Sequence, residues 1–284
     1  MKIHLFLAMP VLVCLFTGPN TRTYVASTPA HAEVRDFLGI SLTDSIDFIR
    51  WKLDLGPDSF ELQCKYGVAK PGSPGFINEK KASFRGRLTK ISNRYSLQHQ
   101  GKQLSLLEVN TDLLHLLDQH NDMLIGNSGY SYALNSTAPV KTDQFNIQPV
   151  RSTFRYPLDF EGRTPCQELS RLLALNKSEA CDKMKWHIIF YTDSLTGQPS
   201  YYLKGGIGYR KETMEKGKWQ FIKKEDGRIF YRLHPDNNSY SLYLLKGDDN
   251  ILFFTDPEGR LLVGNEDFSY TLNRRKEEHP PIYR

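Results

Sequence analysis

One line of this sequence is written twice. "MLIGNSGYSYALN" at residues 123–135 returns as "LLVGNEDFSYTLN" at residues 261–273, and upstream of it residues 104–127 lie on residues 242–265 without a gap. Followed outward, the similarity covers roughly a hundred residues, which is longer than the period of about 20 to 50 residues found in solenoid repeats. The chain is therefore predicted to contain a duplicated domain.

Two further landmarks extend the repeat toward its beginning. "YSLQH" at 95–99 matches "YRLHP" at 231–235, after two residues are gained in the second copy. Trp51 in "RWKLDL" lies opposite Trp186 in "KWHIIF". Both copies should therefore share one order of structural elements.

Within each copy the hydrophobic period is two. "SFELQCKY" places Phe60, Leu62 and Cys64 on one face, as in a half-buried strand. Fifteen Tyr and sixteen Phe also favour strands. Tight turns such as "DPEG" at 256–259 separate the segments. The strands expected in the second copy are 156–162, 185–193, 200–209, 218–223, 229–235, 239–247, 251–256 and 268–273.

Short strands joined by tight turns, with no helical crossovers, predict antiparallel meanders. Eight such strands close into an up-and-down barrel, which removes exposed sheet edges. We therefore predict an all-β protein of two tandem antiparallel eight-stranded barrels.

One short helix is expected near the start of each copy. In the second copy Thr164 is the expected N-cap, Pro165 the first helical residue, and Gln167 the partner three residues after the cap. The weaker equivalent in the first copy is "TDSIDFIR" at 43–50, and "FLG" at 37–39 is expected to be part of the first strand.

The repeated line is predicted to be the closing strand of each barrel, paired with the first strand of its own copy. Gly126 and Gly264 are expected to hold a turn conformation that a Cβ disfavours, with the following Asn capping the turn. Tyr132 and Tyr270 are expected to be core aromatics.

The N-terminus is interpreted as a targeting signal. Lys2 precedes an apolar run at 3–16 that is too short to span a bilayer, and Ala30-His31-Ala32 has the small-x-small pattern of a cleavage site. Cys14 raises the alternative of a lipid anchor, although a bulky Val13 precedes it. The mature chain has no transmembrane span and is expected to be exported, to the periplasm or to the outer membrane or cell surface.

These interpretations divide the chain into five segments. They are a signal peptide at 1–32, a first barrel at 33–138, a linker at 139–152, a second barrel at 153–275 and a polar tail at 276–284. The net charge of +5 falls by two when Lys2 and Arg22 leave with the signal, which is too little to indicate nucleic-acid binding.

Cys166 and Cys181 are predicted to form a disulfide. They flank the second helix in an exported chain, and the entropy model gives a loop of this size about 3 kcal/mol. The alternative is a metal-binding or redox pair, whose short motifs have a different spacing. Cys64 lies on an apolar face and is expected to be a small buried hydrophobe.

No metal, cofactor or catalytic group is predicted. His99, His115, His120 and Met123 fall together in the first copy, but the residues opposite His115 and His120 are Phe253 and Glu258, so the set is not repeated. The sequence lacks Gly-x-Ser-x-Gly, His-Glu-x-x-His, Walker and dinucleotide glycine patterns. An exported enzyme would need a site assembled from scattered residues.

"FEGRTPCQEL" at 160–169, followed by antiparallel strands and a closing "FSYTLN", resembles the NlpE-type family of bacterial envelope lipoproteins. The resemblance implies small lipocalin-like barrels and a link to copper homeostasis and surface sensing. That family continues Gly-x-x-Pro-Cys with a second Cys. This chain keeps Gly162, Pro165 and Cys166 but has Leu169 in the second position, so the paired-Cys motif is not retained.

Two functions follow from the sequence. The first is a non-catalytic envelope protein that binds or senses, either for a small apolar ligand or in envelope stress and metal homeostasis. The alternative is a structural or interaction protein with filled barrels. For that alternative, Tyr201, Tyr202 and Tyr209 in "SYYLKGGIGYRK" would form an exposed aromatic surface for a glycan or another envelope protein.

Overall fold

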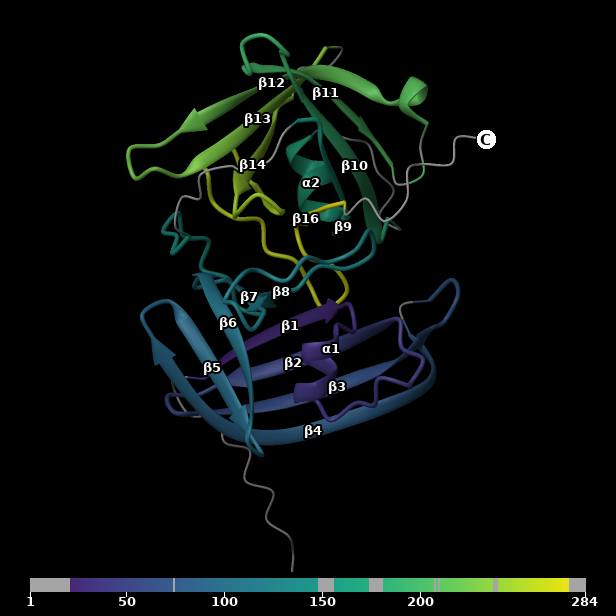
Figure 1. Cartoon of the computed structure of the whole chain (residues 1–284), viewed down its shortest axis with the longest axis vertical. Coiled ribbons are helices and arrows are strands. Elements are labelled where there is room, and N and C mark those ends of the chain that lie inside the picture. Colours follow the sequence, from purple (N-terminus) through teal and green to yellow (C-terminus); the bar gives the residue numbers. More distant parts are fainter. Residues whose placement is uncertain are drawn as a thin grey trace, which may run out of the picture.

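The protein contains two closed antiparallel barrels of eight strands, one above the other along the long axis (Figure 1). The computed structural model describes residues 21–73, 75–147, 156–173, 181–206, 208, 210–236 and 240–275. In these segments no helix is long and apolar enough to cross a membrane. The predicted fold class is confirmed, and the expected signal residues 1–20, Cys14 and the tail at 276–284 lie outside the described residues.

In the first barrel each strand pairs with the next along the chain, and the last closes on the first through Val25 and Asn135. One short helix, α1 (Ala32–Phe37), follows the first strand. The strands are β1 (Arg22–Thr28), β2 (Phe48–Leu55), β3 (Ser59–Ala69), β4 (Phe76–Ile91), β5 (Arg94–His99), β6 (Lys102–Asn110), β7 (Leu113–Leu117) and β8 (Ala133–Ser136).

The second barrel repeats this order, and its last strand closes on its first through Asn273 and Glu161. The helix α2 (Gln167–Leu172) again follows the first strand, and a 3-10 turn, η1 (Lys211–Thr213), precedes the fourth. The strands are β9 (Leu158–Pro165), β10 (Lys183–Thr192), β11 (Pro199–Gly205), β12 (Glu215–Lys223), β13 (Ile229–Pro235), β14 (Leu242–Lys246), β15 (Ile251–Thr255) and β16 (Thr271–Arg274). All eight predicted strands are present, and both closing strands pair as predicted.

A shared hydrogen bond fixes the correspondence of the first strands. The indole Nε1–H of Trp51 donates to Oγ1 of Thr28, and that of Trp186 donates to Oγ1 of Thr164, both at 2.8 Å. Thr28 is the last residue of β1 and Thr164 the last but one of β9, and each is followed by proline. The "TP" pair, rather than "FLG" and "FEG", is therefore the true match between the copies.

The first barrel consequently begins earlier than predicted. β1 pairs with β2 over its whole length, so the barrel starts at Arg22 and not at residue 33. Cleavage after Ala32 would remove β1 and open the barrel. The segment 37–39 ends α1 rather than forming a strand, and 43–50 leads into β2 rather than forming a helix.

The beginning of α2 also differs from the prediction. Cys166 is its N-cap, while Thr164 still belongs to β9, where its hydroxyl accepts the tryptophan hydrogen bond. The tertiary contact therefore outweighs the local capping pattern. The predicted disulfide joins Cys166 to Cys181, with their Cα atoms 5.8 Å apart, and links the start of α2 to the chain that enters β10.

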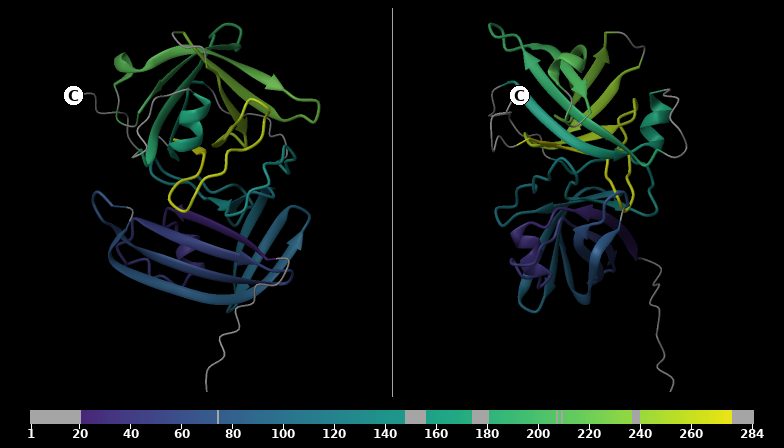
Figure 2. Two further views of the ribbon diagram at one scale, coloured as in Figure 1. Left: turned by 180° about the vertical axis from the view of Figure 1, so that it is seen from behind. Right: turned by 90° about the vertical axis from the view of Figure 1, so that its right-hand side faces the viewer.

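The barrels meet through β7, β15 and the loops before their closing strands, and Figure 2 shows the loop before β16 reaching the first barrel. All five residues of β7 and of β15 are buried, because one face of each strand lines its own barrel and the other packs against the opposite barrel. The apolar cluster between the barrels is Val109, Leu113, Leu117, Met123, Ala133, Ile147, Phe230, Leu245, Ile251, Phe253 and Leu261.

Equivalent residues of the two copies contact each other across this interface. The backbone N–H of Gly126 donates to Oδ1 of Asn273 at 2.8 Å, and that of Gly264 donates reciprocally to Oδ1 of Asn135 at 2.9 Å. Further contacts join Ser131 to Ser269, Tyr130 to Phe268 and His115 to Phe253. This reciprocity is the mark of an isologous, two-fold interface. The line is repeated because it forms both sides of that interface.

The two glycines are required by close approach rather than by an unusual φ. A Cβ at Gly126 would lie 2.2 Å from the Tyr130 carbonyl oxygen and 2.8 Å from Asn273 Oδ1, and Gly264 has matching neighbours. Neither glycine has positive φ, so the predicted reason was wrong. The predicted asparagine caps are confirmed, since Oδ1 of Asn127 accepts from the N–H groups of Gly129 and Tyr130.

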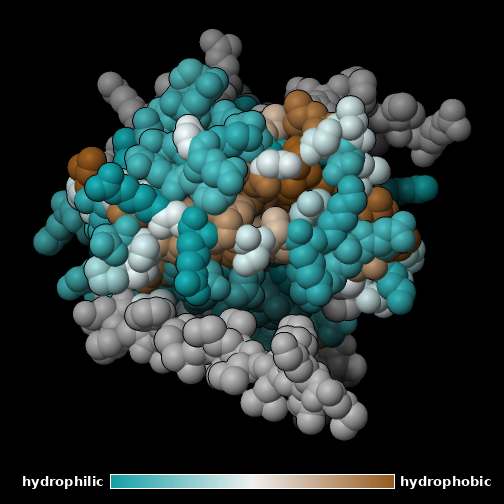
Figure 3. Space-filling model, turned by 90° about the horizontal axis from the view of Figure 1, so that it is seen from below, coloured by the Kyte–Doolittle hydropathy of each residue, from teal (hydrophilic) through white to brown (hydrophobic). Residues whose placement is uncertain are grey.

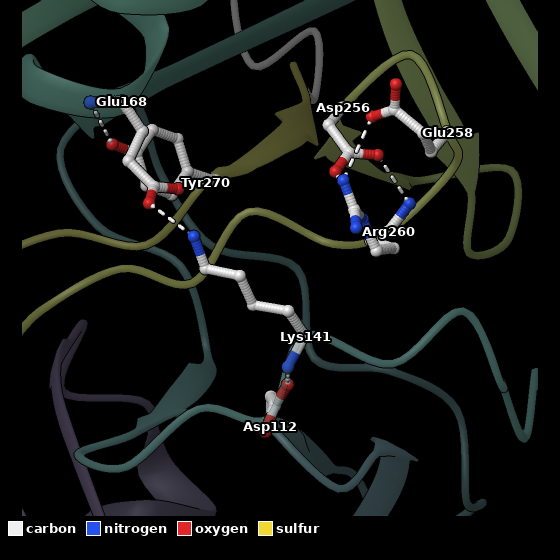
Figure 4. A network of polar contacts seen from close by, with 7 residues as sticks. All are labelled: Asp112, Lys141, Glu168, Asp256, Glu258, Arg260 and Tyr270. Atoms are coloured by element: carbon white, nitrogen blue, oxygen red, sulfur yellow. Dashed lines mark hydrogen bonds and ion pairs between the residues drawn. The ribbon is translucent and has the colours of Figure 1, made fainter.

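The linker ties the first barrel to α2 (Figure 4). The carboxylate of Asp112 accepts hydrogen bonds from the backbone N–H groups of Val140 and Lys141. The Lys141 Nζ then lies 3.2 Å from Oε1 of Glu168, whose backbone N–H donates to the hydroxyl of Tyr270. The helix at the end of the second barrel is thus held from both barrels.

Candidate functional site

At one pair of neighbouring, inward-facing strand positions, the two barrels carry residues of different chemical character. In the first barrel Leu62 of β3 is the Cα partner of Phe84 on β4. In the second barrel Lys204 of β11 is the partner of Glu215 on β12. The pairs are equivalent, because Leu62 and Lys204 each lie opposite the residue two positions after the conserved tryptophan. An apolar pair is therefore replaced by a pair of opposite charges.

Lys204 and Glu215 form a partly buried ion pair inside the end of the barrel that carries α2. The Lys204 Nζ lies 2.5 Å from Oε2 of Glu215, and the two side chains are 15% and 25% exposed. Nζ also donates to the hydroxyl of Tyr240 at 2.9 Å and lies 5.8 Å from the centre of the Trp186 ring. Burial lowers the pKa of Lys204, but the bonds to Glu215 and Tyr240 outweigh it, so the amine stays charged.

Tyr202 precedes this pair on the same inward face of β11. Its ring lies across Gly217, where a Cβ would be 2.6 Å from Cε1, just as the ring of Phe60 lies across Gly86 in the first barrel. The side chain is completely buried, and its hydroxyl has no hydrogen-bond partner among the described residues. Burial, with the charge of Glu215 next, raises the pKa of Tyr202, so the hydroxyl remains a donor.

This polar cluster is unfavourable for a barrel that only has to fold. A buried donor without a partner destabilises a protein by about 1–3 kcal/mol, and a buried ion pair is often no better than apolar residues of the same size. The first barrel shows that the same fold closes with Leu62, Phe84 and Phe60 at these positions. The cluster of Tyr202, Lys204, Glu215 and Tyr240 is therefore the candidate functional site.

A second set of ion pairs, at the opposite ends of the barrels, belongs to both copies. In the first barrel Lys90 Nζ lies 2.5 Å from Oε2 of Glu108. In the second, Lys246, at the position equivalent to Glu108, lies 2.6 Å from Oδ1 of Asp249. Only the position of Glu108 and Lys246 is shared, because Lys90 lies on β4 whereas Asp249 follows β14. Neither pair joins residues that are partners on neighbouring strands, as Lys204 and Glu215 are.

The predicted aromatic surface is not formed as expected. Tyr202 is buried in the barrel core, so its assignment to an exposed face is wrong. Tyr201 points outward, is half-buried, and stacks on Tyr191 with ring centres 4.4 Å apart. Tyr209 lies outside the described residues.

The candidate metal residues of the first copy are separated in space. The ring of His99 stacks on Phe84, His115 is buried between the barrels, and His120 lies in an exposed turn. In the described part of the chain no three His, Cys, Asp or Glu side chains gather as metal ligands. Cys64 is buried among apolar residues as predicted, and burial raises its pKa.

The chain matches no protein-family model, no curated protein and no solved structure. The site must therefore be interpreted from its own geometry. Sequence reasoning did not find Lys204 and Glu215, although the alternation from Tyr202 places Lys204 on the inward face. An alignment of Gly217 with Gly86 would also have placed Glu215 opposite Lys204.

Proposed function

We propose that this protein is a non-catalytic binding or sensing protein of the cell envelope, in which the second barrel binds a small, largely apolar ligand and the first barrel is a scaffold. The observation that carries the proposal is the exchange of the inward pair Leu62 and Phe84 for Lys204 and Glu215. Small eight-stranded barrels hold packed side chains or one small ligand, and polar groups at fixed positions orient a ligand in an apolar site.

An envelope location is proposed on three grounds. The apolar run at 3–16 has the form of an export signal, and the disulfide between Cys166 and Cys181 is compatible with an oxidising compartment. The resemblance to NlpE-type lipoproteins points to the same place. Metal sensing is the weaker form of the proposal, since Leu169 occupies the position of the second family cysteine and is buried in the core.

The test converts the site of the second barrel into that of the first. In the double variant Lys204→Leu/Glu215→Phe, the purified protein should stay folded and lose a co-purified ligand that native mass spectrometry finds at fixed stoichiometry on the wild type. The matched control is Glu61→Gln/Arg85→Gln, which removes an ion pair of 2.7 Å from the outside of the first barrel and should keep the ligand. A bare wild-type mass from several expression hosts would sink the proposal.

The alternative is an interaction protein whose barrels are filled, and two features favour it. Large side chains such as Trp51, Phe190 and Tyr231 occupy the two interiors and are buried. Apolar atoms also gather in the middle of the face of the first barrel that points away from the second (Figure 3). The half-buried hydrophobic residues that pack against the core of the first barrel are Ala30, Ile46, Tyr66, Ala82, Phe84 and Tyr95. Retention of a protein partner by the double variant would favour this alternative.

A further inference from the structure

We infer that the second barrel recognises an uncharged carbonyl group, as in an amide or an ester, carried on an apolar body, and that the Tyr202 hydroxyl donates the hydrogen bond to it. The inference rests on the proposed binding function of the second barrel and adds the chemical class of its ligand.

The group that lacks a partner is a donor. The Tyr202 hydroxyl is fully buried, has no hydrogen-bond partner among the described residues, and stays protonated because burial raises its pKa. Its neighbour Tyr240 already accepts from Lys204 and lies 3.3 Å from Glu215, so it is occupied. An acceptor atom on a ligand would satisfy this buried donor.

The charges around Tyr202 disfavour an ionised ligand. Lys204 is neutralised by Glu215 at 2.5 Å, and the carboxylates of Glu215 and Asp236 both act on the Tyr202 hydroxyl. An added carboxylate would therefore meet two acids and only one base. An added ammonium would have to compete with Lys204 for Glu215. Because burying an unpaired charge is far more costly than burying a hydrogen-bonded neutral group, a neutral acceptor fits best.

The surroundings of the polar cluster fit an apolar body. Trp186 lies beside Lys204, and Leu169 and Leu173 of the α2 segment belong to the same buried cluster as Trp186 and Tyr202. Met184, half-buried, packs against this cluster from β10. Aromatic and aliphatic walls around a few placed polar groups are typical of sites for small apolar molecules.

The first barrel supplies an internal reference for this inference. Phe60 occupies the position of Tyr202 and packs against Phe37 of α1 and against Phe84. There the ring carries no hydroxyl and Phe84 takes the place of Glu215, so these positions of the first barrel have no group to orient a carbonyl. Tyr202→Phe therefore imports a residue that the same fold already accepts.

The experiment uses the full chain and four probes with the same eight-carbon acyl or alkyl chain: octanamide, methyl octanoate, octanoate and octylamine. Binding is measured at neutral pH by tryptophan fluorescence and by isothermal titration calorimetry. We expect octanamide and methyl octanoate to bind at one site, at least about tenfold more tightly than octanoate or octylamine. Tyr202→Phe should weaken octanamide by about tenfold, equivalent to about 1.4 kcal/mol. Tyr201→Phe is the matched control, since it removes the neighbouring outward hydroxyl, and should have no effect.

The outcomes separate the ligand class from the proposed function. Suppose that octanoate or octylamine binds as tightly as octanamide, and that the variant Lys204→Leu/Glu215→Phe loses this binding. That result would overturn the carbonyl inference and keep the second barrel as the binding site. Unchanged octanamide affinity in Tyr202→Phe would also overturn the inference. Binding of no probe, or binding that survives the double variant, would overturn both.

Discussion

The two barrels share the same order of strands and differ in the side chains that point into the barrel at one end. Both have eight strands, a helix after the first strand, a tryptophan bonded to a threonine and the same closing line. They differ where Leu62 and Phe84 become Lys204 and Glu215, and where Phe60 becomes Tyr202. The comparison separates residues that make the fold from residues that the fold can exchange, and the exchanged residues are the ones that need a functional explanation.

The interface between the barrels, in contrast, is built from residues that the two copies share. Its hydrogen bonds are nearly symmetric, because both copies kept the glycine and asparagine residues that meet across the interface. Symmetry is broken at His115, whose equivalent and contact partner is Phe253. The two copies thus stay alike at most of the positions where they contact each other, and differ at Tyr202, Lys204 and Glu215 inside the second barrel.

The largest expected effect tests whether the two closing strands contribute equally to the free energy of unfolding. Tyr270→Ala should destabilise the protein by about 3–5 kcal/mol, since a large buried aromatic is removed from the second core. Tyr132→Ala should produce a loss of the same size in the first core. Denaturant unfolding followed by tryptophan fluorescence measures both, because Trp51 reports on the first barrel and Trp186 and Trp219 on the second.

A loss below about 1 kcal/mol in only one of these variants would contradict the equivalence of the copies. Tyr243→Phe is a control on the outside of the second barrel and should leave the unfolding midpoint unchanged. It removes only a hydroxyl from a side chain that is partly exposed.

The strand content and closure of the fold could be predicted from the sequence because alternation and turn chemistry are local signals. The first strand could not, since the match of Thr28 to Thr164 rests on tryptophan hydrogen bonds that only the folded barrel reveals. The segment at 30–32, which has the pattern of a cleavage site, leads into α1, which begins at Ala32 and packs Val34 and Phe37 into the first core. Short patterns of this kind are compatible with several structures, and tertiary contacts decide among them.

The candidate site was harder to predict for a different reason. Lys204 and Glu215 are eleven positions apart and each resembles a solvated strand residue, until the register of β11 against β12 places them opposite one another. The interface had a readable signal, since "LLHLL" and "ILFFT" are continuous apolar runs typical of strands covered on both faces.

A second prediction uses the residue that breaks the symmetry of the interface. Burial lowers the pKa of His115 to about 4 from its ordinary value of 6.5, with a smaller opposing contribution from its hydrogen bond to the Leu116 carbonyl. The folded protein therefore holds the imidazole neutral, while the unfolded chain takes up a proton below pH 6.5. Stability is complete above that pH and falls as the pH drops to about 4, by about 3 kcal/mol at 1.36 kcal/mol per pKa unit.

His115→Phe, which copies Phe253 onto its own equivalent, should remove this part of the pH dependence. The free energy of unfolding is measured by denaturant titration at several pH values across the interval, in wild type and variant. His120→Phe is the control, because His120 lies in an exposed turn and should leave the pH dependence unchanged. Parallel curves for wild type and His115→Phe would show that the histidine does not titrate with unfolding.

The smallest expected effects come from the reciprocal hydrogen bonds across the interface. Asn135→Ala leaves the Gly264 N–H without its acceptor, and Asn273→Ala does the same to Gly126. Each should destabilise the protein by about 1–3 kcal/mol, the usual cost of leaving a buried donor without its acceptor, and the two losses should be nearly equal. The measurement is the shift of the denaturant midpoint at constant slope. Asn135 also donates to the Asn265 carbonyl at 3.1 Å, so any excess should fall on Asn135→Ala. A larger loss of stability in Asn273→Ala would instead show that the two reciprocal hydrogen bonds contribute unequally to stability despite their matching geometry.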